Sequence, residues 1–188
     1  MIHVIFGKKG SGKTTLSKAL MLKTGGRVVF LSPVETVNMK HIELWDIESI
    51  PDAMQNLNPG QIVLVRRADI EAMDVTALTA IITAKGYTVV IDEVDRYKES
   101  RELKDMIHYS RHFDINIIVN TRRYADVPRL LTSQADHLYI FQTNEPRDLD
   151  YIRSFCGRHF ADKTQNLPLY TYLEYPSQLT GQSQDYGI

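Results

Sequence analysis

The stretch GKKGSGKT, Gly7 to Thr14, combines the residue types that bind phosphate groups. It satisfies the pattern G-x-x-x-x-G-K-[ST] in full, and it lies between an apolar run and a helix-patterned segment, which is the context that confirms such a motif. The glycines allow the backbone to turn tightly and to aim its N–H groups at an anion, and the helix that follows adds the positive end of its dipole. The sequence therefore predicts a phosphate-binding loop, or P-loop.

The residues expected to bind a nucleotide belong to this loop and to the start of the helix after it. They are Gly7, Lys8, Lys9, Gly10, Ser11, Gly12, Lys13, Thr14 and Thr15. Lys13 should reach the β- and γ-phosphates of ATP, which also makes it a candidate catalytic residue, and the Thr14 hydroxyl should bind Mg²⁺. The pattern thus implies ATP and Mg²⁺ as cofactors.

A second candidate site lies in YTVVIDEVDRY, where an apolar run ends in two adjacent carboxylates, Asp92 and Glu93. Taken alone, the pair could be a solvated strand end. In a protein that also has a P-loop, a buried strand ending in Asp holds Mg²⁺ through the water shell of the ion, so we expect this role for Asp92. Glu93 is then placed to activate a water molecule as the general base.

The composition is that of an ordinary soluble protein of 188 residues, with 43% hydrophobic and 24% charged residues. The formal net charge of -1 gives no support for nucleic-acid binding, so any DNA contact would need a local basic patch or a ring of subunits. The single cysteine, Cys156, excludes an internal disulfide framework. No apolar run approaches the roughly 18 residues of a membrane helix, and the N-terminus lacks a signal-peptide pattern. These features predict a cytoplasmic protein with no membrane span of its own.

Short apolar segments alternate along the chain with helix-patterned ones, which predicts an α/β fold with a mainly parallel central sheet flanked by helices. The predicted strands are Ile2–Phe6, Arg27–Leu31, Gln61–Val65, Tyr87–Ile91, Ile115–Asn120 and His137–Phe141. The predicted helices are Lys13–Lys23, Pro51–Leu57, Asp74–Lys85, Glu99–His112, Asp126–Gln134 and Pro146–Cys156, the last with Asn144 as a candidate N-cap.

No linker divides the chain, so we expect one P-loop domain over residues 1–175. The segment 167–175 could add an edge strand. The stretch that follows, residues 176–188, is polar and is expected to be a loose tail. Two predicted strands lie between the P-loop strand and the Asp92-Glu93 strand, which favours the class of P-loop ATPases with an extra strand.

Three segments carry a resemblance to a known family: GKKGSGKT, VVIDE and residues 108–152, which contain SRHFDINII and QADHLYIFQTNEPRDLDYI. The chain resembles the HerA/FtsK superfamily of DNA-pumping ATPases from residue 1 to about residue 155. It is most similar to the genome-packaging ATPases of membrane-containing double-stranded DNA viruses, with Zot-like assembly proteins of filamentous phages close by.

The resemblance implies a RecA-like core that works as a homo-oligomer, usually a hexameric ring, and passes double-stranded DNA through its pore. It also implies that the protein acts in the host cytoplasm or on the virion, and that its partner is a viral capsid or membrane vertex protein. A further implication is an arginine finger that one subunit inserts into the ATP site of its neighbour. Arg111 is the preferred candidate and Arg123 is the second, while an ordinary surface arginine is the alternative at either position.

The chain departs from the family at one position. The family ends the strand before Arg122 with Thr-Gln, and that Gln senses the γ-phosphate, whereas here Thr121 is followed by Arg122. An arginine cannot accept a hydrogen bond, so it cannot orient a water molecule as an amide does. Either Asn120 or Thr121 takes over as the sensor, or Arg122 contacts the phosphate as a charge.

Several other features are open to two interpretations. The pair Arg66-Arg67 is a candidate DNA loop or subunit interface, and the charged run from Arg96 to Asp105 predicts a salt-bridged helix that could also line a pore. His108 and His112 have a metal-binding spacing if they share a helix, but no third ligand is evident. Tyr97 and Tyr124 are expected to be packing residues.

Three functions fit this sequence. The first is a DNA-translocating ATPase, and the second is a Zot-like ATPase of virion assembly, a class that often carries a membrane span. The third is a P-loop kinase of nucleotides or small metabolites, which needs no water-activating Glu but usually has an Arg-rich lid that is not evident here.

Overall fold

The computed structural model describes residues 1–31, 39–44, 46, 48–65, 70–97, 100–176 and 184–187. The candidate pair Arg66-Arg67, Lys98 in the charged run and most of the predicted tail lie outside the described residues. The chain divides into two compact units. Unit 1 contains Met1, residues 18–92 and residues 99–118, and unit 2 contains residues 2–17, 93–98 and 119–188.

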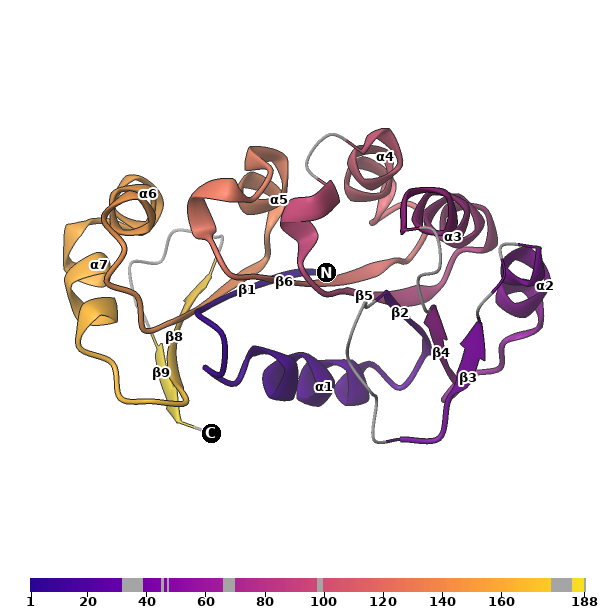
Figure 1. The fold of residues 1–188 in the computed structure, drawn as a ribbon, viewed down its shortest axis with the longest axis horizontal. Coiled ribbons are helices and arrows are strands. Elements are labelled where there is room, and N and C mark those ends of the chain that lie inside the picture. The colour runs from indigo at the N-terminus through magenta and orange to yellow at the C-terminus, as the bar shows by residue number, and fades with distance from the viewer. Residues whose placement is uncertain are drawn as a thin grey trace. The chain divides into compact units, whose positions relative to one another are not determined.

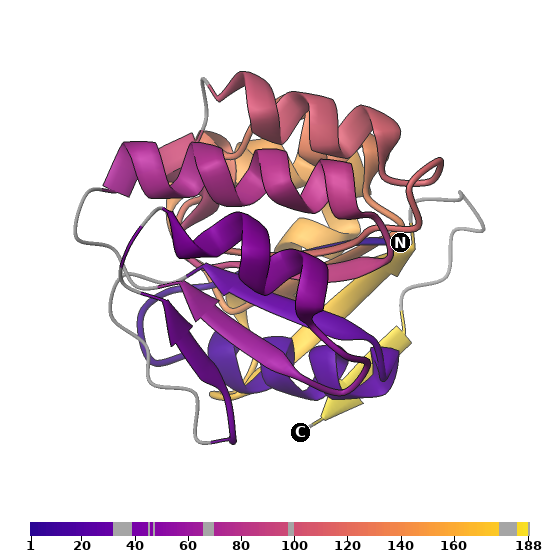
Figure 2. The same ribbon diagram turned by 90° about the vertical axis from the view of Figure 1, so that its right-hand side faces the viewer.

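Unit 1 is built on four parallel strands. They are β2 (Arg27–Leu31), β3 (Ile42–Leu44), β4 (Ile62–Val65) and β5 (Tyr87–Ile91), in the order β3-β4-β2-β5. Three helices lie on one face of these strands: α2 (Ser49–Asn56), α3 (Ile70–Ala84) and α4 (Arg101–Tyr109) (Figures 1 and 2). Strands β4 and β5 are buried at every position, as expected of parallel strands that helices cover.

Unit 2 joins two parallel strands to an antiparallel hairpin. The strands are β1 (Ile2–Phe6), β7 (His137–Phe141), β8 (Thr171–Pro176) and β9 (Gln184–Gly187), in the order β1-β7-β8-β9. Its helices are α5 (Arg129–Gln134), α6 (Pro146–Cys156) and α7 (Arg158–Gln165), and α6 packs on α7 (Figure 1). Two 3-10 turns, η1 (Val94–Tyr97) and η2 (Tyr124–Asp126), complete the unit.

Two elements run from one unit into the other. Helix α1 (Lys13–Thr24) begins in unit 2 and ends in unit 1, and strand β6 (Asn116–Thr121) begins in unit 1 and ends in unit 2. The α/β class and the mainly parallel sheet flanked by helices are thus confirmed. No helix of the described residues is both long and apolar enough to cross a membrane.

Helix α4 is shorter than predicted. It begins after Ser100, whose hydroxyl accepts a hydrogen bond from the Leu103 N–H at 3.1 Å, and it ends at Tyr109 rather than at His112. His108 is therefore the last but one residue of the helix, and His112 follows in a turn. The i,i+4 helical spacing on which the metal interpretation depended is wrong, and no group of three or more described His, Cys, Asp or Glu residues could hold a metal ion.

The structure corrects the N-cap predicted for α6 and the loose tail predicted for residues 176–188, and it contains elements that were not predicted. The N-cap of α6 is Glu145 rather than Asn144, and Pro146 occupies the first turn, where a missing N–H costs nothing. Gly157, with a φ of 90°, separates α6 from α7, a helix that the sequence reading did not predict. Strands β3 and β9 were also not predicted, and β9 pairs with β8 inside the segment expected to be a loose tail.

Candidate nucleotide-binding site

The P-loop connects β1 to α1 in unit 2. The nine residues predicted to bind a nucleotide, 7–15, form this loop and the first turn of α1. The first residue of the loop is bound to β6, since the Gly7 N–H donates a hydrogen bond to the Thr121 carbonyl at 3.2 Å. The loop then closes on itself through a hydrogen bond from the Ser11 N–H to the Lys8 carbonyl at 3.3 Å. Gly12 has a φ of 105°, a conformation that needs glycine.

The interior of the loop fits a phosphate group. A methyl group on Gly7 would lie 2.5 Å from Ser11 Oγ and 2.8 Å from Phe141 Cβ, so only glycine allows these two residues to approach the loop so closely. The Ser11 hydroxyl is buried and is one of two described side chains with a buried polar atom that lacks a hydrogen-bond partner. An orphaned donor of this kind inside a glycine-lined loop is what a bound phosphate oxygen would satisfy.

Two of the three lysines of the loop make hydrogen bonds, one within the loop and one to the residue after β7. Lys13 Nζ donates to the Lys8 carbonyl at 2.9 Å, and Lys8 Nζ donates to Gln142 Oε1 at 3.1 Å. The ammonium group of Lys13 therefore lies against the loop that is expected to bind the phosphates. Ser17, one turn further along α1, donates to Asn120 Oδ1 at 2.6 Å, so the side chain of Asn120 points at the helix rather than at the solvent.

The predicted magnesium residues belong to different units. Asp92 directly follows β5 in unit 1, and its N–H donates to the Leu31 carbonyl at 3.0 Å. Thr14 lies in the first turn of α1, in the part of the helix that belongs to unit 2. Both side chains are partly buried. Carboxylate and hydroxyl oxygens are ligands that Mg²⁺ accepts, so the chemistry of both residues fits the role predicted for them.

Glu93, the predicted general base, adopts an unusual conformation and is bound by two arginines. Its φ of 56° places a residue with a side chain in the left-handed region, which costs free energy and is common at functional sites. One carboxylate oxygen pairs with Arg96 at 2.9 Å, and the other pairs with the guanidinium of Arg122. The side chain of Glu93 is only 14% exposed. Both carboxylate oxygens have a guanidinium partner, so a water molecule that gives its proton to Glu93 would compete with these ion pairs.

Thr121 connects the P-loop to the segment after Glu93. Its carbonyl accepts the hydrogen bond from the Gly7 N–H. Its buried hydroxyl lies 3.0 Å from the Arg123 carbonyl and 3.4 Å from Asp95 Oδ1, and it can donate its one proton to either of these acceptors. A change in position at the end of β6 would therefore reach both the loop and the turn η1. The side chain of Thr121, one of the two sensor candidates at the end of β6, lies close to Asp95, two residues after the predicted general base.

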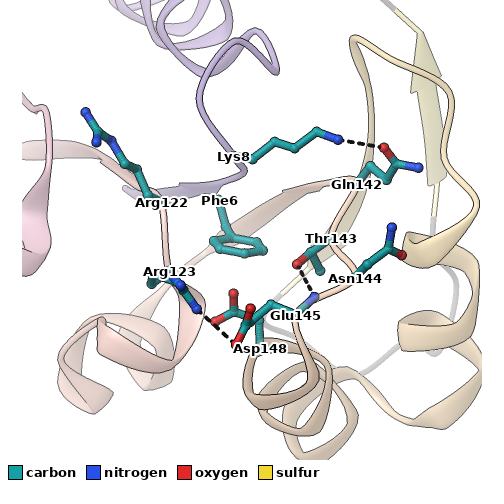
Figure 3. Close-up of a pocket in the computed structure, with 9 residues that line it drawn as sticks. All are labelled: Phe6, Lys8, Arg122, Arg123, Gln142, Thr143, Asn144, Glu145 and Asp148. Carbon is teal, nitrogen blue, oxygen red and sulfur yellow. Dashed lines mark hydrogen bonds and ion pairs between the residues drawn. The ribbon is translucent and has the colours of Figure 1, made fainter.

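A cavity of about 280 Å³ opens beside the loop, within unit 2. It is lined by Phe6, Lys8, Arg122, Arg123, Gln142, Thr143, Asn144, Glu145 and Asp148 (Figure 3). Figure 3 shows the Phe6 ring in the middle of this group, with the Lys8–Gln142 contact on one side and the pair of Arg123 and Glu145, 3.1 Å apart, on the other. The cavity therefore has cations and carboxylates on its walls and an aromatic side chain at its base.

Asp148 fixes the wall of this cavity. It is 2% exposed, and its Oδ1 accepts a hydrogen bond from the Ala125 N–H in η2 at 3.0 Å. Burial raises the pKa of this carboxyl group above its usual value, although the Ala125 N–H and the nearby Arg123 guanidinium act in the opposite direction. Asp148 thus holds the turn that follows Arg123 against the start of α6.

The two candidate arginine fingers lie in different places. Arg123 belongs to the cavity of unit 2 and pairs with Glu145. Arg111 lies in unit 1, in the exposed turn after α4.

Aromatic packing supports the strand that precedes the loop. The Phe6 ring at the end of β1 packs edge-on against Tyr124, with ring centroids 5.3 Å apart. Tyr97 and Tyr124 are both buried, so the expectation that they pack rather than bind is confirmed.

The reading of the sequence missed two contacts of the site. Arg96 was assigned to an exposed charged helix, but it lies in η1 and contacts Glu93. The partnership of Arg122 with Glu93 was also missed, because 29 residues separate the two in sequence. The spacing of Glu93 and Arg96, three residues apart after a strand, was the one local signal that could have suggested the first contact.

Comparison with known proteins agrees with this geometry. Residues 3–158 match the model of a protein family described as the ATPase family associated with various cellular activities (AAA). No curated protein sequence matches the chain.

Solved structures share the fold at low sequence identity. The genome packaging NTPase B204 from Sulfolobus turreted icosahedral virus 2, in complex with AMPPCP, is 20% identical, with a TM-score of 0.81 over 100% of this chain and 97% of that one. The N-terminal domain of zonular occludens toxin from Neisseria meningitidis is 18% identical, with a TM-score of 0.56 over 100% of this chain and 93% of that one. The two groups of proteins that the sequence resembles are thus confirmed as neighbours in fold.

Proposed function

The chain belongs to the AAA family of ATPases and hydrolyses ATP, and on this premise we propose that it translocates double-stranded DNA as a subunit of a viral genome-packaging motor. One observation carries the proposal: the fold of a genome packaging NTPase matches the whole of this chain and almost the whole of its own, with a TM-score of 0.81. The zonular occludens toxin domain covers as much of this chain but with a lower TM-score of 0.56, so the agreement in backbone favours the packaging NTPase.

The proposed chemistry assigns one task to each residue. The loop from Gly7 to Thr15 binds the phosphates, with Lys13 as the charge near the β- and γ-phosphates and Ser11 Oγ as an added donor. Thr14 and Asp92 would hold Mg²⁺, which neutralises the charge that develops on the phosphate oxygens. Glu93 accepts the proton of the attacking water, which competes with Arg96 and Arg122 for the carboxylate.

The proposed assembly is a ring, hexameric in the expected case, with double-stranded DNA in its pore. An arginine from the neighbouring subunit, Arg111 or Arg123, would stabilise the transition state, a contribution of roughly 10³–10⁵ in rate for such fingers. A capsid or membrane vertex protein of the virus would hold the ring in place. A single chain has a net charge of -1, so attraction to DNA would depend on basic residues that several subunits contribute to the pore.

The test is steady-state phosphate release from ATP by the wild type and by Glu93→Gln, with and without long linear duplex DNA. We expect duplex DNA to raise the turnover of the wild type and to have no effect on Glu93→Gln. Short duplexes of equal total base-pair concentration are the matched control, because a motor that moves along DNA spends more time coupled on a long substrate. Equal rates with and without DNA of any length would contradict the translocation proposal.

A second candidate is an ATPase of virion assembly, which the fold of the zonular occludens toxin domain supports. That likeness is weaker, with a TM-score of 0.56 against 0.81. The same experiment separates the two functions, since an assembly ATPase should hydrolyse ATP at a rate that DNA does not change. A rate that rises only after a membrane-bound partner is added would favour this second candidate.

A further inference from the structure

A strained turn precedes β8 at residues 168–171. The Thr171 N–H donates to the Pro168 carbonyl at 3.2 Å, which closes a four-residue turn, and the Thr171 hydroxyl donates to the same carbonyl at 2.7 Å. Tyr170 occupies the third position of the turn with a φ of 64°. A positive φ at this position is the type II pattern, which favours Gly or Asn because a side chain is strained there. The chain instead has a tyrosine.

The two central side chains of this turn face the solvent. Leu169 and Tyr170 are each 55% exposed, and they are adjacent. Several other tyrosines of unit 2 pack against aromatic neighbours, as Tyr172 does with Phe141 at a centroid distance of 5.4 Å. Among the described residues the Tyr170 ring makes no such ring contact. An exposed aromatic ring held in a strained backbone conformation is a candidate for ligand contact, since strain of this kind persists where function requires it.

The Tyr170 ring lies beside the P-loop. A methyl group on Gly12 would be 3.6 Å from Tyr170 Cδ1 and 3.5 Å from Phe141 Cε1, so both rings border the last glycine before Lys13. The turn is held in this place by the sheet, because Phe141 at the end of β7 pairs with Tyr172 at the start of β8. The ring is therefore placed next to the residues that are expected to bind phosphate, in a short turn directly before β8 rather than on a long loop.

We propose that Tyr170, with Leu169 at its edge, is the platform on which the base of the P-loop-bound nucleotide stacks. The base of a nucleotide is joined to its phosphates through one ribose, so the base must lie near the loop that holds the phosphates. The exposed Tyr170 side chain lies beside Gly12 of that loop. The inference rests on the proposed binding of phosphates by residues 7–15, but it does not depend on DNA translocation.

Stacking has a consequence for specificity. Every base has a π-face, and base–aromatic stacking is tolerant of base identity. The tyrosine face and the leucine side chain offer no hydrogen-bond pattern that would distinguish adenine from guanine or a pyrimidine. The chain should therefore bind ATP, GTP and CTP with dissociation constants within about tenfold of one another, with the larger purines bound more tightly.

The first test compares ATP with inorganic tripolyphosphate, which has the phosphates and no base. Binding of each to the wild type, Tyr170→Phe and Tyr170→Gly is measured by titration calorimetry. Tyr170→Gly removes the ring and also relieves the backbone strain, so it should fold at least as well as the wild type. We expect it to lose about tenfold or more in ATP affinity, as removal of one stacking contact does, while Tyr170→Phe keeps its affinity.

Tripolyphosphate should bind the wild type and Tyr170→Gly equally. Equal ATP affinity in the wild type and Tyr170→Gly would overturn the proposal, and so would a matching loss of tripolyphosphate affinity, which would assign Tyr170 to the support of the loop. A wild type that binds tripolyphosphate poorly would count against the phosphate site itself. A failure of DNA to stimulate hydrolysis would bear on the translocation proposal alone.

The second test observes the contact directly. The chain has one tryptophan, Trp45, so the double variant Trp45→Phe/Tyr170→Trp carries a single fluorescent reporter at the platform. Its emission should change when ATP is added and should stay constant when tripolyphosphate is added. The matched control is Trp45→Phe/Leu22→Trp, because Leu22 is exposed on α1 and away from the P-loop in sequence. An equal response to ATP in both variants, or a response of the Tyr170 reporter to tripolyphosphate, would overturn the assignment.

Discussion

The carboxylate of Glu93 is bound by the guanidinium of Arg122, the residue that directly follows β6. Arg122 is 57% exposed, whereas Glu93 is 14% exposed, so the pair lies at the edge between buried loop and solvent. The family that the sequence resembles has a glutamine at this position, and a glutamine could not form an ion pair. The replacement therefore gives the predicted general base a charged partner that competes with the attacking water for the carboxylate.

Loss of the Glu93 charge should stop hydrolysis and spare binding. Glu93→Gln keeps the size of the side chain and its ability to contact the arginines, but an amide does not accept a proton from water. We expect turnover to fall by about 10²–10⁴, the usual contribution of a general base, with little change in ATP affinity. Single-turnover phosphate release and titration calorimetry measure the two quantities. Glu145→Gln, which changes a carboxylate of the adjacent cavity, is the control, and near-normal turnover in Glu93→Gln would contradict the assignment.

Arg96→Gln should raise turnover. The Arg96–Glu93 pair at 2.9 Å competes with the water that Glu93 must contact, and a pair with a half-exposed arginine contributes about 0.2–1 kcal/mol. Its removal should therefore speed hydrolysis by a factor of about two to five at saturating ATP. Arg158→Gln removes an exposed arginine from α7 and should change nothing. A fall in turnover in Arg96→Gln would mean that Arg96 positions Glu93 for catalysis.

Gly7→Ala should abolish nucleotide binding and leave the fold intact. The added methyl group would meet Ser11 Oγ at 2.5 Å and Phe141 Cβ at 2.8 Å, so either the loop interior closes or the strand end moves. Overpacking of this kind costs about 1–3 kcal/mol, which the loop can absorb only by losing its shape. ATP binding by calorimetry and stability by thermal unfolding separate the two effects. Gly26→Ala is the control, because its nearest neighbour would be the Thr24 carbonyl at 3.9 Å.

Prediction from the sequence was most accurate where one local pattern determines the structure. Strands β1, β2, β5 and β7 have the predicted boundaries, because each is a largely apolar run with a glycine or an aspartate directly next to at least one of its ends. The P-loop was predictable for the same reason, since eight consecutive residues define it. Strand β3 was missed because it has three residues and two of them are exposed, so it has no apolar run.

Features that depend on contacts between distant segments were not predictable. Helix α4 ends at Tyr109 because the chain turns there into β6, although the helical pattern continues to His112. The ion pair of Arg122 with Glu93 and the position of Tyr170 beside Gly12 arise only when β6 and β8 take their places in the sheet. From the sequence, Arg96 was expected on an exposed charged helix and Arg122 was a candidate for contact with the phosphate, and neither expectation indicated Glu93 as the partner.

Mixed assemblies should reveal which arginine acts across a subunit boundary. If Arg111 is the finger, Arg111→Ala and Glu93→Gln are each inactive, but a mixture restores sites in which one subunit supplies Glu93 and its neighbour supplies Arg111. Equal amounts that mix at random in a ring should recover at most about one quarter of the wild-type rate. The same experiment with Arg123→Ala is the comparison. Recovery with Arg123→Ala and none with Arg111→Ala would reverse the preferred assignment.

The buried histidine of β1 should make the fold sensitive to acid. His3 is 7% exposed, its ring stacks on that of His137 with centroids 5.0 Å apart, and its Nδ1 lies 3.2 Å from the Tyr139 hydroxyl. Burial, followed by repulsion from His137, lowers the pKa of His3 from its usual 6.5 to about 4. Between these two values the unfolded chain binds a proton that the folded chain does not, so stability decreases as the pH falls from about 6.5 to about 4.

The expected loss reaches about 3 kcal/mol when the pH is below both values, at 1.36 kcal/mol for each unit of pKa difference. Urea unfolding of the wild type and of His3→Phe at pH 7.5, 5.5 and 4.0 measures it. Phenylalanine keeps the aromatic stack and cannot be protonated, so His3→Phe should lose less stability than the wild type over this range. Asp136 and the His137–Glu174 pair are present in both proteins, so their titration contributes to both curves. Parallel losses in the two proteins would show that His3 does not cause the acid sensitivity.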